Sequence, residues 1–186
     1  ILLLAALMLG GCATHWPETA LLNPQVIPSN QQYYSGNRIT LEGVDKREAA
    51  YVFSIKKKEK AAVLVNSEQP LNNLLAEKLA EGLRSQGLEV GNSGTTNLTL
   101  AISSAAVTVE EKTFTYVTKS RVSLQVIADF QGSKLTKQFN MSSSKEGPGE
   151  PSMADLESTL NQQLGSVLQQ IMADEALRGY LKGQPS

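Results

Sequence analysis

The stretch NLTLAISSAAVTVEEKTFTYVTKSRVSLQVIADF, residues 97–130, indicates the architecture best, because apolar and polar side chains alternate along most of it. A period of two predicts strands with one buried face. In the first half the apolar phase shifts between Leu98–Ile102 and the pair Val107 and Val109, which predicts a β-bulge. We therefore expect two long strands joined by a hairpin whose charged tip is Glu110–Thr113.

More strands are predicted on both sides of this hairpin. Gln131–Lys134 is typical of a second hairpin turn and leads into an alternating run that ends at Met141. Ser142–Pro151, which contains Gly147, Pro148 and Gly149, is expected to be a flexible loop. Shorter strands are predicted upstream at Ile39–Val44, Tyr51–Lys56, Ala61–Val65 and Leu88–Val90.

Two segments change to the period of a helix. The first is predicted from Pro70 to Gln86, with proline at the first helical position and Gly87 as the stop. The second follows Ser152, which with Asp155 resembles a capping box, and its apolar stripe extends from Leu156 to Ile171. The predicted fold class is α+β: an antiparallel sheet with two long amphipathic helices packed on one face.

The N-terminus has the features of an export signal. Ile1–Leu9 is apolar but shorter than the roughly 20 residues that span a bilayer, and small residues follow it. The tetrad Leu9-Gly10-Gly11-Cys12 resembles the lipobox of bacterial lipoproteins, in which the cysteine is acylated and the preceding peptide is removed. This resemblance implies a membrane anchor through acyl chains on Cys12. Ala13 stands where an Asp commonly signals retention in the inner membrane, which implies the outer membrane with the domain facing the periplasm.

Three parts of the chain are predicted from these patterns. Residues 1–11 form a signal peptide that lacks its basic start, and residues 12–37 form the lipidated N-terminus and a tether punctuated by proline. Docking of Ala20–Ile27 on the domain stays open as an alternative. Residues 38–186 are predicted to form a single α+β domain.

The residue inventory argues against catalysis and metal binding. One histidine, His15, lies in the predicted tether, and Cys12 is the sole cysteine, so neither a zinc set nor a His-based triad can be assembled. We predict no enzyme activity, no metal and no cofactor. With 17 basic and 18 acidic residues, the overall charge favours neither a nucleic-acid partner nor an anionic-membrane surface.

Two local motifs connect the chain to a known family. Gly43-Val44-Asp45-Lys46-Arg47 resembles the Gly-x-Asp-x-Arg segment of the YajG family of uncharacterised bacterial lipoproteins, and the segment Arg84–Gly91 after the first helix resembles that family too. The resemblance covers nearly all of the sequence after Cys12. It implies a compact, anticodon-binding-domain-like α+β fold, and it carries over no catalytic residues.

Several charged groups are candidates for contacts, each with a structural alternative. Asp45 and Arg47 leave a strand end, where we favour a structural ion pair over a site. Lys56–Lys60 is interpreted as a solvated turn in preference to a lipid or glycan contact. The hairpin-tip residues Glu110, Glu111 and Lys112 are predicted to be possible partner contacts.

The expected function is a non-enzymatic binding or assembly module for an envelope protein partner, held at the outer membrane. Unpaired sheet edges are the most accessible contact surfaces, because they accept added strands. The alternative is a periplasmic carrier or sensor of a small apolar or glycan ligand held between the helices and the sheet.

Overall fold

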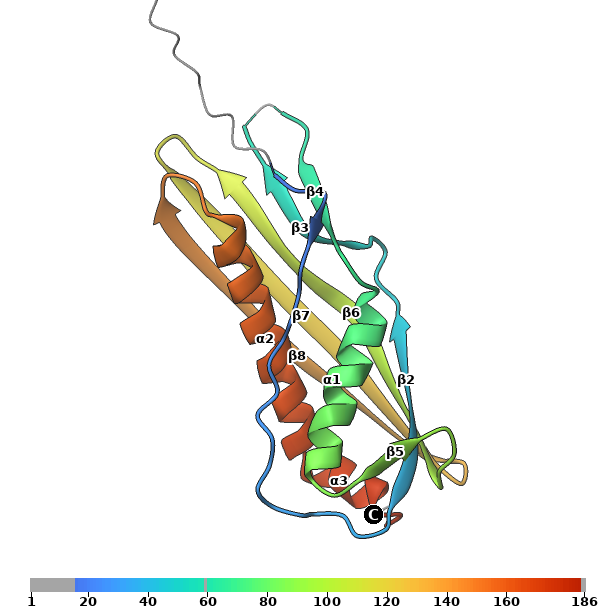
Figure 1. Cartoon of the computed structure of the whole chain (residues 1–186). Helices are drawn as coiled ribbons and strands as arrows, with labels where there is room; N and C mark the ends of the chain where they lie inside the picture. The colour runs from blue at the N-terminus through green and yellow to red at the C-terminus, as the bar shows by residue number, and fades with distance from the viewer. Residues whose placement is uncertain (1–15, 59, 185–186) are drawn as a thin grey trace, which may run out of the picture.

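The computed structural model describes residues 16–58 and 60–184 and shows one sheet with helices on one face (Figure 1). In chain order the elements are β1 (Thr19–Ala20), β2 (Arg38–Asp45), β3 (Tyr51–Lys56), β4 (Val63–Ser67), α1 (Leu71–Ser85), β5 (Glu89–Gly91), β6 (Thr96–Glu111), β7 (Thr115–Phe130), β8 (Ser133–Pro148), α2 (Met153–Ala173) and α3 (Glu175–Leu181).

Three long strands form one side of the sheet. β6, β7 and β8 have 16 residues each and pair antiparallel in sequence order. Ile102 pairs with Leu124 and Ser104 with Ser123, so Ser103 is the extra residue of a bulge. The predicted hairpin and the predicted bulge are both confirmed.

The predicted fold class is wrong. The side of β6 that faces away from β7 pairs with β2 and, farther along, with β3, and both pairings are parallel. The eight strands therefore form a mixed sheet, which curls into a half-barrel with three helices. Parallel strands need a crossover connection, which β4, α1 and β5 supply between β3 and β6. Alternation in a short run predicts a strand but not the direction of its neighbour.

Helices α1 and α2 lie on the same face of the sheet (Figure 1), and their apolar stripes form the core. Leu75 and Leu79 of α1 and Leu160 and Leu164 of α2 are all 0% exposed. The capping box at Ser152 is present, and Gly87 follows α1 with the positive φ of 89° expected at a helix stop. α3 is an additional helix, capped by the Asp174 side chain.

An ion pair closes the gap between β2 and β3. Asp45 pairs with Ile102 and Phe53 with Val107, so the ladder is interrupted between them. The Arg47 side chain, 7% exposed, lies in this gap. Its Nη2 lies 2.8 Å from the Asp45 carboxylate, and its Nη1 donates to the Ala105 carbonyl at 3.5 Å. The structural interpretation of this pair is therefore the one observed.

The segment 16–37 is docked on the helices, so within this range the docked alternative is observed and the tether is not. The segment pairs with β4 through β1 and then follows α1 and α2 to the far end of α1 (Figure 1). The Leu21 and Asn23 amides donate to the side chains of Glu157 and Asn161 of α2, at 3.2 and 2.8 Å. These partners are more than 130 positions away in the sequence, which is why local composition did not predict them.

Candidate functional site

The predicted lipidation motif lies outside the described residues. This applies to Leu9, Gly10 and Gly11 of the cleavage motif and to Cys12 itself. The first described residue is Trp16, whose side chain is buried against the domain.

The predicted contact residues lie at the tip of the β6–β7 hairpin. Glu110 and Glu111 end β6, and Lys112 begins the turn. Glu110 lies 3.5 Å from Lys119 and Lys112 lies 3.7 Å from Glu146, and these four side chains are each about half exposed. The tip is therefore a solvated charged end of the sheet, with two of its three charges already paired.

Strand β8 is an open edge of the sheet. Among the described residues it pairs with β7 alone. The sequence predicts a flexible loop from Ser142 onward, but the strand continues to Pro148 because each of its residues has a register partner in β7. Natural edge strands are usually protected by charges, proline or bulges. The stretch Gln138–Ser144 has no charge, no proline and no glycine, and its pairing with β7 is regular.

The inner side of β8 is firmly attached to the helices. Gln163 of α2 donates through Nε2 to the hydroxyl oxygens of Ser120 and Ser143, at 2.6 and 2.9 Å. Lys137 forms an ion pair with Asp174, the cap of α3. β8 therefore presents its free edge from a rigid position.

A shallow polar depression of about 440 Å³ adjoins this edge on the face opposite the helices. Its lining comprises Ser103, Ser104, Arg121, Val122, Ser123, Asn140, Met141 and Ser142. Ser103 is the bulged residue of β6, so the bulge helps to shape the hollow. The exposed Arg121 guanidinium makes no hydrogen bond or ion pair with another described residue, which leaves it available to a carboxylate.

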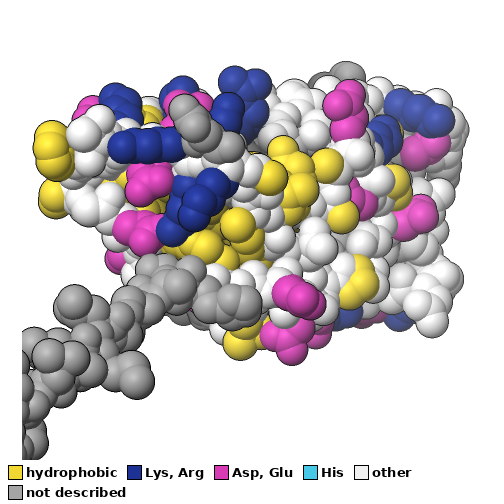
Figure 2. Space-filling view, turned by 90° about the horizontal axis from the view of Figure 1, so that it is seen from above, with side chains coloured by type: hydrophobic (Ala, Val, Ile, Leu, Met, Phe, Trp, Pro, Cys, Tyr) yellow, Lys and Arg dark blue, Asp and Glu magenta, His cyan; other side chains and the backbone are white. Residues whose placement is uncertain are grey.

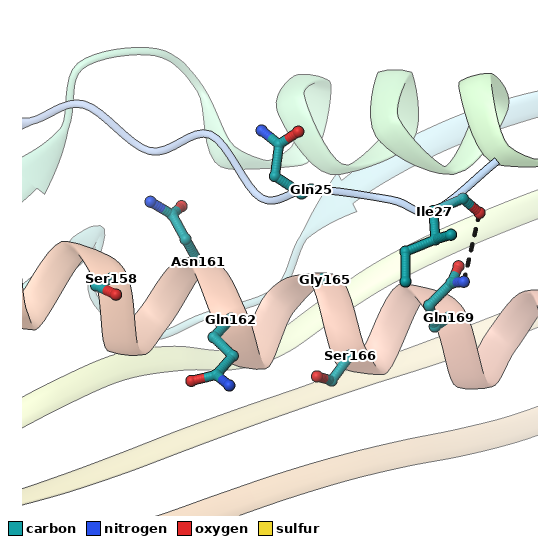
Figure 3. A pocket seen from close by; sticks show the side chains of 8 residues that line it. All are labelled: Gln25, Ile27, Ser158, Asn161, Gln162, Gly165, Ser166 and Gln169. Atoms are coloured by element: carbon teal, nitrogen blue, oxygen red, sulfur yellow. Dashed lines mark hydrogen bonds between the residues drawn. The ribbon is translucent and has the colours of Figure 1, made fainter.

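A second hollow, of about 620 Å³, lies between α2 and the docked N-terminal segment (Figure 3). Gln25 and Ile27 come from the segment, and the α2 residues are Ser158, Asn161, Gln162, Gly165, Ser166 and Gln169. The Gln169 amide donates to the Ile27 carbonyl at 3.4 Å. The polar lining is entirely uncharged, so this hollow has hydrogen-bonding groups but no acid, base or nucleophile pair.

The shifted titratable groups have structural causes. The hydrogen bond from Arg47 lowers the pKa of Asp45, and the Ser152 hydroxyl in the capping box lowers the pKa of Asp155. Burial opposes ionisation of Asp174, but bonds from Lys137 and from the Leu177 amide outweigh it and lower its pKa. Burial raises the pKa of Tyr34 to about 12, against the opposing charge of Arg178. Within residues 16–58 and 60–184, no three His, Cys, Asp or Glu side chains are grouped to hold a metal.

The chain is similar to bacterial lipoproteins described as uncharacterized. A family model described as "Uncharacterized lipoprotein" matches residues 24–182. The chain is 25% identical over 182 residues to the uncharacterized lipoprotein YajG of Escherichia coli K12, a match that covers 97% of this chain and 94% of YajG, and YajG of E. coli O6:H1 matches equally. The crystal structure of protein XCC0632 from Xanthomonas campestris has the same fold, with a TM-score of 0.65 at 10% identity over 89% of this chain and 98% of that one. No helix in the described part of the chain is both long and apolar enough to cross a membrane.

Proposed function

We propose, on the premise that this chain belongs to the family of uncharacterized lipoproteins, that it is a lipid-anchored binding module of the bacterial envelope and not an enzyme. The anchor is Cys12, and Ala13 after it favours the outer membrane. The contact surface is the open edge of β8, which captures an extended segment of an envelope protein. The observation that supports this most strongly is the unprotected, uncharged edge Gln138–Ser144.

Substitution of Cys12 tests the anchor. Cys12→Ala should abolish incorporation of labelled palmitate and release the protein from the membrane fraction. The melting temperature should not change, because Cys12 precedes the folded domain that the sequence predicts. Palmitate labelling that persists in this variant would refute acylation at Cys12.

The geometry of β8 specifies what kind of segment would bind. Side chains alternate along the strand. The polar Gln138, Asn140 and Ser142 lie on the sheet face opposite the helices, whereas Phe139 and Met141 face the helices and are half-buried. An added strand would continue both rows. A segment with alternating apolar and polar residues fits best. An acidic residue beside Ser142, the register partner of Arg121, would reach across β8 to the guanidinium and add a charge-assisted hydrogen bond.

Crosslinking in intact cells tests this edge. A photoreactive amino acid at Asn140 should crosslink to an envelope protein, whereas the same group at the exposed Gln131, in the β7–β8 turn, should not. Asn140→Lys should weaken this capture, because a lysine on an edge opposes strand addition. Equal crosslinking at both positions, or full capture by Asn140→Lys, would contradict the proposal.

The hairpin tip stays a second predicted contact for the same partner. Reversing Glu110→Lys together with Glu111→Lys should weaken partner capture while leaving the melting temperature nearly unchanged, because both side chains are exposed. If capture is unaffected, the tip is only a solvated turn.

The ligand-carrier alternative has less support. Such a ligand was expected between the helices and the sheet, where the buried leucine, isoleucine and valine side chains form one packed cluster. The hollow beside α2 is open to solvent, and most of its side chains carry amides or hydroxyls (Figure 3), so it does not enclose a small molecule as typical ligand sites do.

A further inference from the structure

One end of the domain collects several loops. The β3–β4 loop, the β6–β7 hairpin tip and the start of α2 lie at the end where the described chain begins (Figure 1). Thr19 pairs with Asn66 of β4, and β4 starts opposite the last residues of β3, so Trp16 enters at this same end. We call it the entry end. The β7–β8 turn and α3 lie at the opposite end of the strands.

The entry end combines exposed apolar and basic side chains. Phe114 in the hairpin is 85% exposed, and Leu64 and Val63 of β4 are 51% and 37% exposed. Beside them a hollow of about 710 Å³ is lined by Lys57, Lys58, Lys60 and Glu111. Figure 2, which looks onto this end, shows lysine and arginine side chains near yellow apolar ones, with aspartate and glutamate side chains among them.

The three lysines that line this hollow differ in whether they form an ion pair. Lys57 is paired with Glu150, but Lys58 and Lys60 form no ion pair with another described residue. An exposed phenylalanine and unpaired lysines at one end of a domain can bind the interface of an anionic bilayer, where the ring enters the headgroup region and the ammonium groups meet phosphates.

The short stretch of chain between Cys12 and Trp16 also places the entry end near the membrane. Four residue steps separate Cys12 from Trp16, and a fully extended chain covers at most about 3.6 Å per step, or about 14 Å in total. Docking of the segment 16–37 leaves only this short connection. If Cys12 is acylated, as the proposed function requires, the entry end must lie close to the lipid surface.

We infer that the entry end is a membrane-docking surface, in which Phe114 inserts at the interface of an anionic phospholipid bilayer and Lys58 and Lys60 bind headgroup phosphates. The long strands then stand away from the bilayer. Sixteen residues of β7 at about 3.4 Å each place the β7–β8 turn on the order of 50 Å farther along the strands.

Depth measurements on the acylated full-length protein test this surface. A spin label is attached at Thr113→Cys, beside Phe114, and in a second protein at Gln131→Cys in the opposite turn. Each is reconstituted in vesicles of phosphatidylcholine with phosphatidylglycerol. We expect the label at 113 to collide with oxygen dissolved in the lipid, and the label at 131 to collide only with a water-soluble relaxant. Equal exposure of both labels to water would overturn the inference.

Two further variants separate the apolar and basic contributions. Phe114→Ser should move the label at 113 into water. Lys58→Glu with Lys60→Glu should do the same and should reduce binding of the Cys12→Ala protein to the same vesicles by on the order of tenfold, since each lysine near an anionic surface favours binding. Lys134→Glu, at the far end, is the matched control and should change neither result. No effect from either entry-end variant would refute the assigned contacts.

Failure of the anchor can be distinguished from failure of the docking surface. Labelled palmitate reports acylation at Cys12 independently of the spin labels. Without palmitate incorporation the proposed anchor fails, whereas incorporation with a water-exposed label at 113 refutes only the docking surface. Circular dichroism melting curves verify that each variant is folded.

Discussion

The N-terminal segment 16–37 and strand β8 are both extended, polar stretches, but they differ in how their backbone groups are paired. The segment has almost no periodic pattern, yet side chains of α1 and α2 hold its backbone along its length. β8 alternates over much of its length and is paired along one side, yet its other edge is open. Backbone groups that bind side chains are not available to a partner, whereas those on an open edge are.

The difference shows where a contact surface can be expected. The docked segment contributes to the packed domain, since Leu22 and Tyr34 belong to its core cluster. β8 belongs to the core by one face only. Substitutions should therefore separate the two regions: some should affect both, some the segment alone, and some β8 alone.

The largest expected effect would reach both regions. Leu75→Ala and Leu164→Ala should each lower the free energy of unfolding by roughly 2–5 kcal/mol, because both side chains are fully buried beneath the helices. Urea denaturation measures this loss. Leu64→Ala, at an exposed position, is the control and should cost under about 1 kcal/mol. A loss that small at both core leucines would contradict the packing.

A smaller effect should appear in the N-terminal segment alone. A Cβ at Gly165 of α2 would lie 2.5 Å from the Gln25 carbonyl oxygen, so Gly165→Ala should push the segment outward and cost about 1–3 kcal/mol. Hydrogen exchange should speed up at the segment amides, such as that of Asn23, while the β8 amides that bond to β7 stay protected.

A second helix glycine provides the matched control. In α3 a Cβ at Gly179 would meet its nearest atom at an ordinary 3.4 Å, so Gly179→Ala should leave stability unchanged or raise it by up to about 1 kcal/mol. A loss at Gly179 as large as that at Gly165 would contradict this explanation, because it would show that the Gly165 loss does not require contact with the segment.

The smallest expected effect concerns the attachment of β8 to α3. The pKa of Asp174 is lowered in the folded protein, so its charge stabilises the fold above its ordinary pKa of 3.8, and this contribution is lost as the pH falls below that value. Asp174→Asn keeps a capping side chain but removes the charge that pairs with Lys137. It should cost under about 1 kcal/mol at neutral pH, and the difference from the native protein should vanish in acid. A difference that is constant with pH would exclude the ion pair as its source.

The sequence predicted best what depends on neighbouring residues. The β6–β7 hairpin, its bulge, the extent of α1 and the capping box of α2 all follow from local periodicity or from residue types a few positions apart. The strand directions could not be predicted this way, because β2 and β3 pair with β6 across more than 50 residues. The end of β8 was missed because Ser142–Ser144 lacks apolar alternation, and its pairing with β7 supplies the strand instead.

The docked segment left a signal that could have been used. Gly165 lies inside a helix, where glycine costs about 1 kcal/mol relative to alanine, and a Cβ there would collide with the Gln25 backbone of the N-terminal segment. An interior helix glycine therefore suggested a close backbone approach. Of the predicted contacts, the hairpin tip could be placed in the structure, while Cys12 lies outside the described residues and stays a prediction.

The long-range docking of the segment also sets an order of events during synthesis and export. Its side-chain partners in α2 lie at least 136 residues later in the chain: Glu157, Asn161 and Gln169. The segment therefore cannot dock on α2 until that helix has been synthesised and has folded. Until then only the contacts of the segment with earlier elements such as β4 and α1 can form, for example the bond from the Ser29 amide to the Ser85 hydroxyl. The acylation proposed at Cys12 can thus precede completion of the domain. The connection between the anchor and the folded part would then be long at first and would shorten only when folding finishes.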